Sequence, residues 1–138
     1  MPKLHHVVHD LRAPLSPEYA AIAGLSGART SRILRLERNI TGRPALSQPM
    51  ADEVIVEIMA ALGLVESGFE ARNIQHFAFK WFAAHRGFRL SRHPAIVRLP
   101  GHLVAMDGRC FVDAEHLEPT PLAHASPRWK LLSARYFD

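Results

Sequence analysis

Three short apolar runs near the C-terminal end constrain the fold more than any other feature of the sequence. Residues 94–113 read PAIVRLPGHLVAMDGRCFVD, and the pairs Pro100-Gly101 and Asp107-Gly108 separate the runs. Short apolar runs divided by such turn-forming pairs are typical of consecutive antiparallel strands. We therefore predict three strands, over residues 94–99, 102–106 and 109–113.

The Asp-Gly pair also predicts how the last two strands face each other. Asp107 and Gly108 both tolerate the positive φ of a type I′ turn, so we expect them to form a two-residue loop. His102 then lies opposite Asp113, with Cβ atoms ~4.5–5.5 Å apart. A carboxylate in that position holds one imidazole nitrogen and leaves the other free to act as a base.

The same register places the only cysteine on the other side of the sheet. Cys110 pairs with Ala105, and because side chains alternate along a strand, it points away from the face that carries His102 and Asp113. Cys110 is therefore a poor candidate for a nucleophile. A single cysteine also excludes an internal disulfide and a multi-cysteine zinc site.

Helical patterns precede these strands. Ser16 and Pro17 are typical of a helix start, and glycines at 24 and 27 interrupt that helix. Three further helices are predicted: over residues 30–40, from Ser47 and Pro49 to Gly63, and over residues 70–85. We expect a first strand within residues 3–11, a loop over 115–127 and a last strand over 129–137.

This order predicts the α+β class, with a helical half over about residues 16–87 followed by an antiparallel sheet over about residues 94–138. The 138 residues are about one domain long, and we treat residues 1–138 as a single domain. With 48% hydrophobic and 22% charged residues, the composition is that of an ordinary globular protein. The sequence has neither a signal-peptide pattern nor an apolar run of ~20 residues, so we expect a cytoplasmic protein without membrane contact.

The strand-turn-strand pattern of residues 94–113, with its Gly-His-x-Val-Ala segment at 101–105 and the aspartate at 113, resembles the histidine hairpin of papain-like cysteine peptidases. Small papain-like proteins of phages and plasmids are the most similar members. The resemblance implies a helical half that presents the nucleophile and a sheet that supplies the histidine and its orienting residue. His102 is then the general base, Asp113 orients it, and the reaction is acyl transfer on a peptide or amide.

The resemblance also implies a nucleophile at the start of the helix near residues 30–32, where no cysteine stands. Ser31 is the nearest hydroxyl, and a helix N-terminus stabilises an oxyanion. Serine at such a position is also a common helix cap. Three interpretations stay open: a catalytically degenerate papain-like domain that binds a peptide or protein, a variant that uses Ser31, and a chain whose nucleophile has been replaced.

The alternative to a papain-like domain is a non-enzymatic basic protein. The formal net charge is +4. Three arginines, Arg32, Arg35 and Arg38, recur every third residue and place a positive stripe on one helix face, which suits an acidic protein or a nucleic acid. No helix-turn-helix, zinc-finger or RNA-recognition pattern accompanies them. The same arginines also serve simply as solubilising charges.

Two histidine patterns near the N-terminus carry weaker hypotheses. The segment HDLRAPLSP at residues 9–17 resembles the phosphoacceptor box of sensor histidine kinases, which implies phosphoryl transfer to His9. No glycine-rich ATP-binding box follows it. His5, His6 and His9 lie close together beside Asp10, but without a second ligand cluster we interpret them as surface or packing residues. We predict no metal and no cofactor, and the oligomeric state is left open.

Overall fold

In the computed structural model, the described part of the chain comprises residues 4–10, 13–42, 50–71, 94–126 and 128–138. Helices come first, in the order α1 (Pro17–Ser26), α2 (Thr30–Thr41) and α3 (Asp52–Ala61). The strands follow as β1 (Glu66–Ala71), β2 (Ala95–Leu99), β3 (His102–Met106), β4 (Cys110–Val112), β5 (Thr120–Pro121) and β6 (Ser133–Phe137), with a short 3₁₀ helix, η1 (Leu122–His124), before β6.

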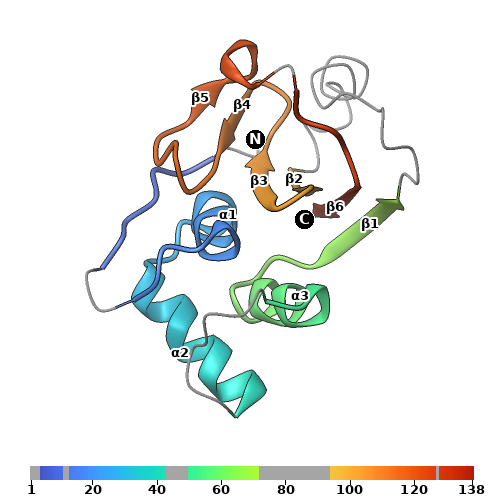
Figure 1. The fold of residues 1–138 in the computed structure, drawn as a ribbon. Coiled ribbons are helices and arrows are strands. Elements are labelled where there is room, and N and C mark those ends of the chain that lie inside the picture. The colour runs from blue at the N-terminus through green and yellow to red at the C-terminus, as the bar shows by residue number, and fades with distance from the viewer. Residues whose placement is uncertain (1–3, 11–12, 43–49, 72–93, 127) are drawn as a thin grey trace.

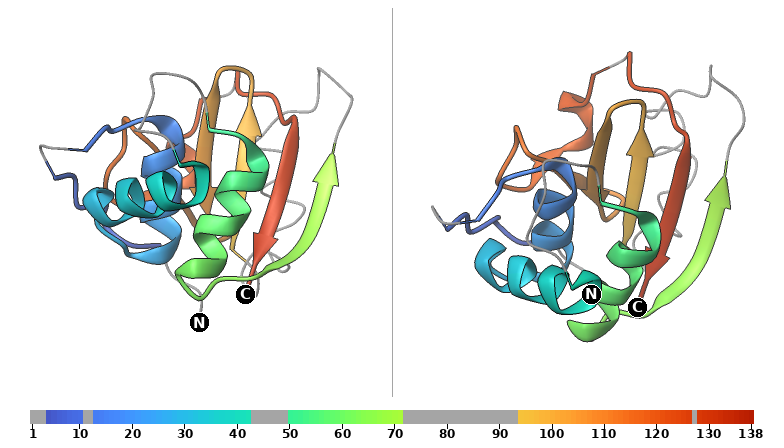
Figure 2. Two further views of the ribbon diagram at one scale, coloured as in Figure 1. Left: turned by 90° about the horizontal axis from the view of Figure 1, so that it is seen from below. Right: turned by 60° about the horizontal axis from the view of Figure 1, so that its bottom comes forward.

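The strands of the described residues form one six-stranded sheet in the order β1-β6-β2-β3-β4-β5, and all neighbouring strands are antiparallel. The three helices lie together on one side of this sheet (Figure 1). Seen from below, they stand in front of the strands (Figure 2). The predicted α+β class, helices first and an antiparallel sheet second, is confirmed.

Capping chemistry explains both ends of α1 and the end of α2. The Ser16 hydroxyl accepts a hydrogen bond from the Tyr19 amide at 3.2 Å, which is the capping role that the sequence predicts. Gly27 ends α1 with φ 78°, and Gly42 ends α2 with φ 69°. Both glycines adopt the left-handed conformation that a side chain would strain.

The third helix begins later than the sequence suggests. Its first residue is Asp52, preceded by Ala51 as the N-cap, and the acidic Asp52 and Glu53 occupy the first turn. Ser47 and Pro49, which the sequence favoured as the opening residues, lie outside the described part of the chain. Ion pairs fix this end of α3 to the sheet, because Asp52 accepts from Arg98 at 2.5 Å and from Arg135 at 3.3 Å.

One predicted helix and one predicted strand are not formed as expected in the described regions. The helix expected over residues 70–85 is wrong at its start, because Glu70 and Ala71 end strand β1 and pair with β6; the remainder lies outside the described residues. The strand expected within residues 3–11 is not formed by residues 4–10. Their backbone bonds to other segments instead, with the His5 amide on the Gly24 carbonyl and the Val7 amide on the Leu117 carbonyl, both at 2.7 Å.

The C-terminal third departs from its prediction in detail. The expected loop over 115–127 contains strand β5, whose Thr120 and Pro121 pair with Phe111 and Cys110, and it also contains the 3₁₀ helix η1. The last strand begins at Ser133 rather than at 129. The predicted strands over 94–99 and 102–106 are confirmed almost residue for residue as β2 and β3.

The sheet separates two apolar clusters. Leu103, Ala105 and Val112 pack with the three helices in the first cluster. Val104 and Met106 belong to the second cluster, on the opposite face. Among the described residues, the segment after β5 contributes to that second cluster: Leu122, Ala125, Trp129 and Leu131. No helix in the described part of the chain is long and apolar enough to span a bilayer.

Candidate active site

The turn between β3 and β4 lies one residue later than predicted. Gly108 and Arg109 form its tip, with Asp107 and Cys110 at its ends and the Asp107 amide bonded to the Cys110 carbonyl at 3.2 Å. Gly108 has φ 97°, whereas no non-glycine residue in the described part of the chain has positive φ. The predicted type I′ turn on Asp107 and Gly108 is therefore wrong, because the positive φ falls on Gly108 alone.

The side chain of Asp107 explains the displaced turn. Its Oδ1 accepts hydrogen bonds from the amides of Arg109 at 3.0 Å and Cys110 at 2.9 Å. An aspartate that bonds the backbone two and three residues ahead stabilises a turn that begins at the aspartate itself. Asp107 thus precedes the loop rather than forming half of it.

The displaced turn changes the register but keeps the faces. Ala105 pairs with Val112 and Met106 pairs with Phe111, whereas the sequence predicts Ala105 opposite Cys110. A shift of two residues leaves every side chain on its predicted face. Cys110 accordingly packs against the first cluster, on the face opposite His102 and Asp113, as predicted. The direct opposition of His102 and Asp113 is wrong, because the observed register places Asp113 beyond the paired residues, level with Val104.

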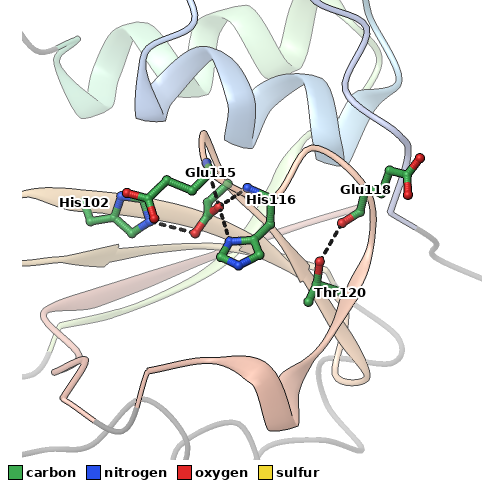
Figure 3. A network of polar contacts seen from close by, with 6 residues as sticks. His102, Glu115, His116, Glu118 and Thr120 are labelled. Atoms are coloured by element: carbon green, nitrogen blue, oxygen red, sulfur yellow. Dashed lines mark hydrogen bonds and ion pairs between the residues drawn. The ribbon is translucent and has the colours of Figure 1, made fainter.

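His102 and Asp113 nevertheless meet. His102 Nε2 lies 2.9 Å from Asp113 Oδ2, so the imidazole reaches along the strand to the carboxylate (Figure 3). The second carboxylate oxygen, Oδ1, accepts three hydrogen bonds from its own loop. These come from the Glu115 amide at 3.0 Å, the His116 amide at 2.7 Å and His116 Nδ1 at 2.8 Å.

Asp113 is thus a buried carboxylate with every oxygen engaged. Its side chain has no exposed surface, whereas those of His102 and His116 are 19% and 36% exposed. Burial raises the pKa of the Asp113 carboxyl, but the hydrogen bonds from the two histidines outweigh burial and bring this pKa below its ordinary value. Asp113 is therefore ionised at neutral pH. Because an ionised carboxylate only accepts hydrogen bonds, both bonded ring nitrogens carry a hydrogen.

Aromatic rings hold the two imidazoles in place. The Trp129 ring lies 5.4 Å from that of His102, and the Phe111 ring lies 5.0 Å from that of His116 and 5.4 Å from that of Trp129. These contacts lie on the face of the second cluster. With Nε2 committed to Asp113, Nδ1 is the nitrogen of His102 that remains to exchange a proton. Within the described ranges, no hydroxyl or thiol bonds to His102.

Ser31 stands apart from this pair. It is the second residue of α2, a helix whose N-cap is Arg29, and its hydroxyl donates a short hydrogen bond to the Asp10 carboxylate. Helix α2 packs against α1 and α3, on the helix side of the sheet. His102 faces the other side. The structure brings His102 and Asp113 together and leaves Ser31 elsewhere, so its role as a nucleophile stays a prediction from the resemblance alone.

The arginines singled out in the sequence form an exposed row. Arg32, Arg35 and Arg38 all lie on the solvent side of α2. They share no contact with the His102 site in the described part of the chain.

Sequence reasoning missed His116. Asp113 and His116 close a tight loop, with the Asp113 amide on the His116 carbonyl at 3.1 Å and the His116 amide on the Asp113 carbonyl at 3.2 Å. The spacing Asp-x-x-His was the available signal, since a turn of this length returns the second side chain to the first. No group of three metal-ligating side chains is found among the described residues.

The chain was compared with protein families, curated proteins and solved structures. No family model, no curated protein and no solved structure matches the chain.

Proposed function

We propose that this chain is a small acyl hydrolase that acts on a peptide or amide with the histidine and aspartate of the papain-like pattern but without its side-chain nucleophile, and in which His102 is the general base. The observation that carries the proposal is the 2.9 Å contact between His102 Nε2 and the buried, ionised Asp113. This contact fixes the tautomer that leaves Nδ1 with its lone pair. The fixed ring and the anion behind it are the two elements that an imidazole base requires.

The nucleophile in this proposal is water. His102 Nδ1 removes a proton from water as the oxygen attacks the acyl carbon, and the imidazolium that forms is stabilised by Asp113 through Nε2. Nδ1 then returns the proton to the leaving nitrogen as the carbon–nitrogen bond breaks, which yields one carboxylic acid and one amine. Asp113 stays ionised throughout. Water is chosen because, in the described residues, Cys110 packs on the opposite face and Ser31 bonds to Asp10.

The experiment measures hydrolysis of p-nitrophenyl acetate and of a panel of peptide aminomethylcoumarin amides by four purified proteins: the wild type, His102→Gln, Asp113→Asn and His124→Gln. His124 is an exposed histidine of η1 and serves as the matched control. We expect His102→Gln to lower the rate by about 100-fold or more, the usual contribution of a general base. We expect Asp113→Asn to lower it by less and His124→Gln to leave it unchanged.

Two outcomes overturn the proposal. If His124→Gln lowers the rate as much as His102→Gln, the hydrolysis arises from unspecific surface imidazoles. If the wild type turns over none of the probes, the degenerate, binding version of a papain-like domain replaces the hydrolase. Far-ultraviolet circular dichroism of each variant keeps a loss of folding from being counted as a loss of the base.

A further inference from the structure

The outward face of α2 carries three guanidinium groups that pair with no carboxylate of the described residues. Arg32, Arg35 and Arg38 are exposed, and none of them has an ion pair or a hydrogen-bond acceptor among the described residues. Other arginines contrast with them: Arg29 bonds to Asp10, and Arg98 bonds to Asp52. The three α2 side chains are thus available to an anion from outside the chain.

The helix geometry arranges them as one stripe. Residues three apart rise by about 4.5 Å and step back by about 60°, so the stripe spans about 9 Å and about 120° of the helix surface. Glu37 is the only acidic residue of α2, and its Oε1 accepts the hydroxyl of the buried Tyr19 at 2.5 Å. The only carboxylate of α2 is therefore engaged by the Tyr19 hydroxyl, on which Arg38 also acts electrostatically.

We propose that this stripe binds the phosphate backbone of a nucleic acid without regard to base sequence. Arginine presents a planar fork of donors that matches phosphate oxygens. Backbone contacts of this kind need charge and no apolar surface, and they carry no sequence information.

The composition of the helix face favours phosphate over an acidic protein. A stable protein interface has an apolar core with aromatic or aliphatic anchors. Helix α2 offers no such anchor outward, because Ile33 and Leu34 are buried and Leu36 and Ile40 pack partly buried against the first cluster. The stripe is polar along its length, with Asn39 exposed beside Arg38.

Fluorescence anisotropy of a labelled DNA duplex of roughly 20 base pairs tests the proposal, with salt varied from about 50 to about 200 mM. Three neutralised phosphates predict a slope of about −2.7 for log affinity against log salt, and Arg32→Gln/Arg35→Gln should bring the slope to about −1. The control, Arg109→Gln/Arg128→Gln, removes the same charge from two other exposed residues. We expect it to keep most of the affinity.

Three results overturn the proposal. In the first, the control variant weakens binding as much as the α2 variant, so that total charge rather than the stripe accounts for the affinity. In the second, the wild type does not bind the duplex even at the lowest salt. In the third, a poly-glutamate peptide binds to the stripe and the duplex does not, which assigns the surface to an acidic protein. All substituted residues are exposed, and glutamine preserves helix propensity, so the variants are expected to fold.

Discussion

Asp113 and Asp10 are two carboxylates of similar design in two different settings. Each accepts hydrogen bonds from two side chains, His102 and His116 on Asp113, and Arg29 and Ser31 on Asp10. The partners hold the pKa of each carboxyl below its ordinary value. Asp113 has no exposed surface, however, whereas the Asp10 side chain is 24% exposed.

The difference teaches what a paired carboxylate contributes. Asp10 ties the segment before α1 to the first turn of α2, since its own amide also bonds to the Thr30 hydroxyl at 2.8 Å. Its charged partner, a guanidinium, gives up no proton at physiological pH. The partners of Asp113 are imidazoles, each of which donates one ring hydrogen to the carboxylate and keeps a second ring nitrogen. The same hydrogen-bond pattern therefore holds two segments together at Asp10 and orients two imidazoles at Asp113, one of which is the base in the proposed function.

The largest contrast is expected from deleting each carboxylate. Asp113→Ala leaves two loop amides and two imidazole donors without their acceptor in a buried site, and we expect the free energy of unfolding to fall by about 3 kcal/mol. Asp10→Ala exposes its former donors to water, so its effect should be much smaller. Urea unfolding at neutral pH measures both. Equal losses in the free energy of unfolding would show that the burial of Asp113 does not make its contacts more stabilising than those of Asp10.

Acid should remove the contribution of Asp113. Because its pKa in the folded protein lies below the unfolded value of about 3.9, its stabilisation is complete above about pH 5 and is lost as the pH falls below 4. The free energies of unfolding of the wild type and Asp113→Asn should therefore converge on acidification, as measured by urea unfolding at a series of pH values. A gap that widens toward low pH contradicts the assigned ionisation.

Removing one donor from each carboxylate sharpens the comparison. His116→Gln leaves Oδ1 of Asp113 with two backbone amides, and we expect a loss of about 1 kcal/mol in the free energy of unfolding. Ser31→Ala leaves Asp10 with Arg29 and should cost less. Thermal unfolding followed by circular dichroism ranks the two variants. Ser31→Ala should also retain any hydrolysis of the ester probe, and its loss would restore Ser31 as a nucleophile.

The smallest effect concerns salt. The Asp10–Arg29 pair is exposed, so about 1 M NaCl should reduce the difference in stability between the wild type and Asp10→Asn. The difference between the wild type and Asp113→Asn should change little, because the Asp113 contacts are shielded from solvent ions. If both differences shrink equally, Asp113 is more accessible than its contacts indicate.

Local signals in the sequence predicted the elements that local chemistry decides. Ser16 as a cap and Gly27 and Gly42 as ends predicted both bounds of α1 and the end of α2, whereas Gly24, also expected to interrupt the first helix, lies inside α1. The apolar runs predicted β2 and β3.

The turn was predicted one residue too early. The Asp107 carboxylate binds the amides of Arg109 and Cys110, and these contacts form only in the folded turn and cannot be read from the sequence.

Contacts between distant segments were beyond the same reasoning. Ser31 looked like a cap or a nucleophile, and its Asp10 partner lies 21 residues earlier in the chain. The faces of the sheet were predicted because alternation survives a shift of two residues, and for this reason the pairing of His102 with Asp113 survived an incorrect register. His116 was missed because its bond to Asp113 depends on the fold of a loop.

The protonation of the two imidazoles tests the central claim most directly. Long-range ¹H–¹⁵N correlation spectra at about pH 8, above the usual titration range of histidine, report which ring nitrogen carries the hydrogen. The account predicts opposite tautomers, with the hydrogen on Nε2 in His102 and on Nδ1 in His116, because each donates to Asp113. His102→Gln and His116→Gln assign the signals. A hydrogen on Nδ1 of His102, with Nε2 unprotonated, would contradict Asp113 as its orienting anion and His102 Nδ1 as the base.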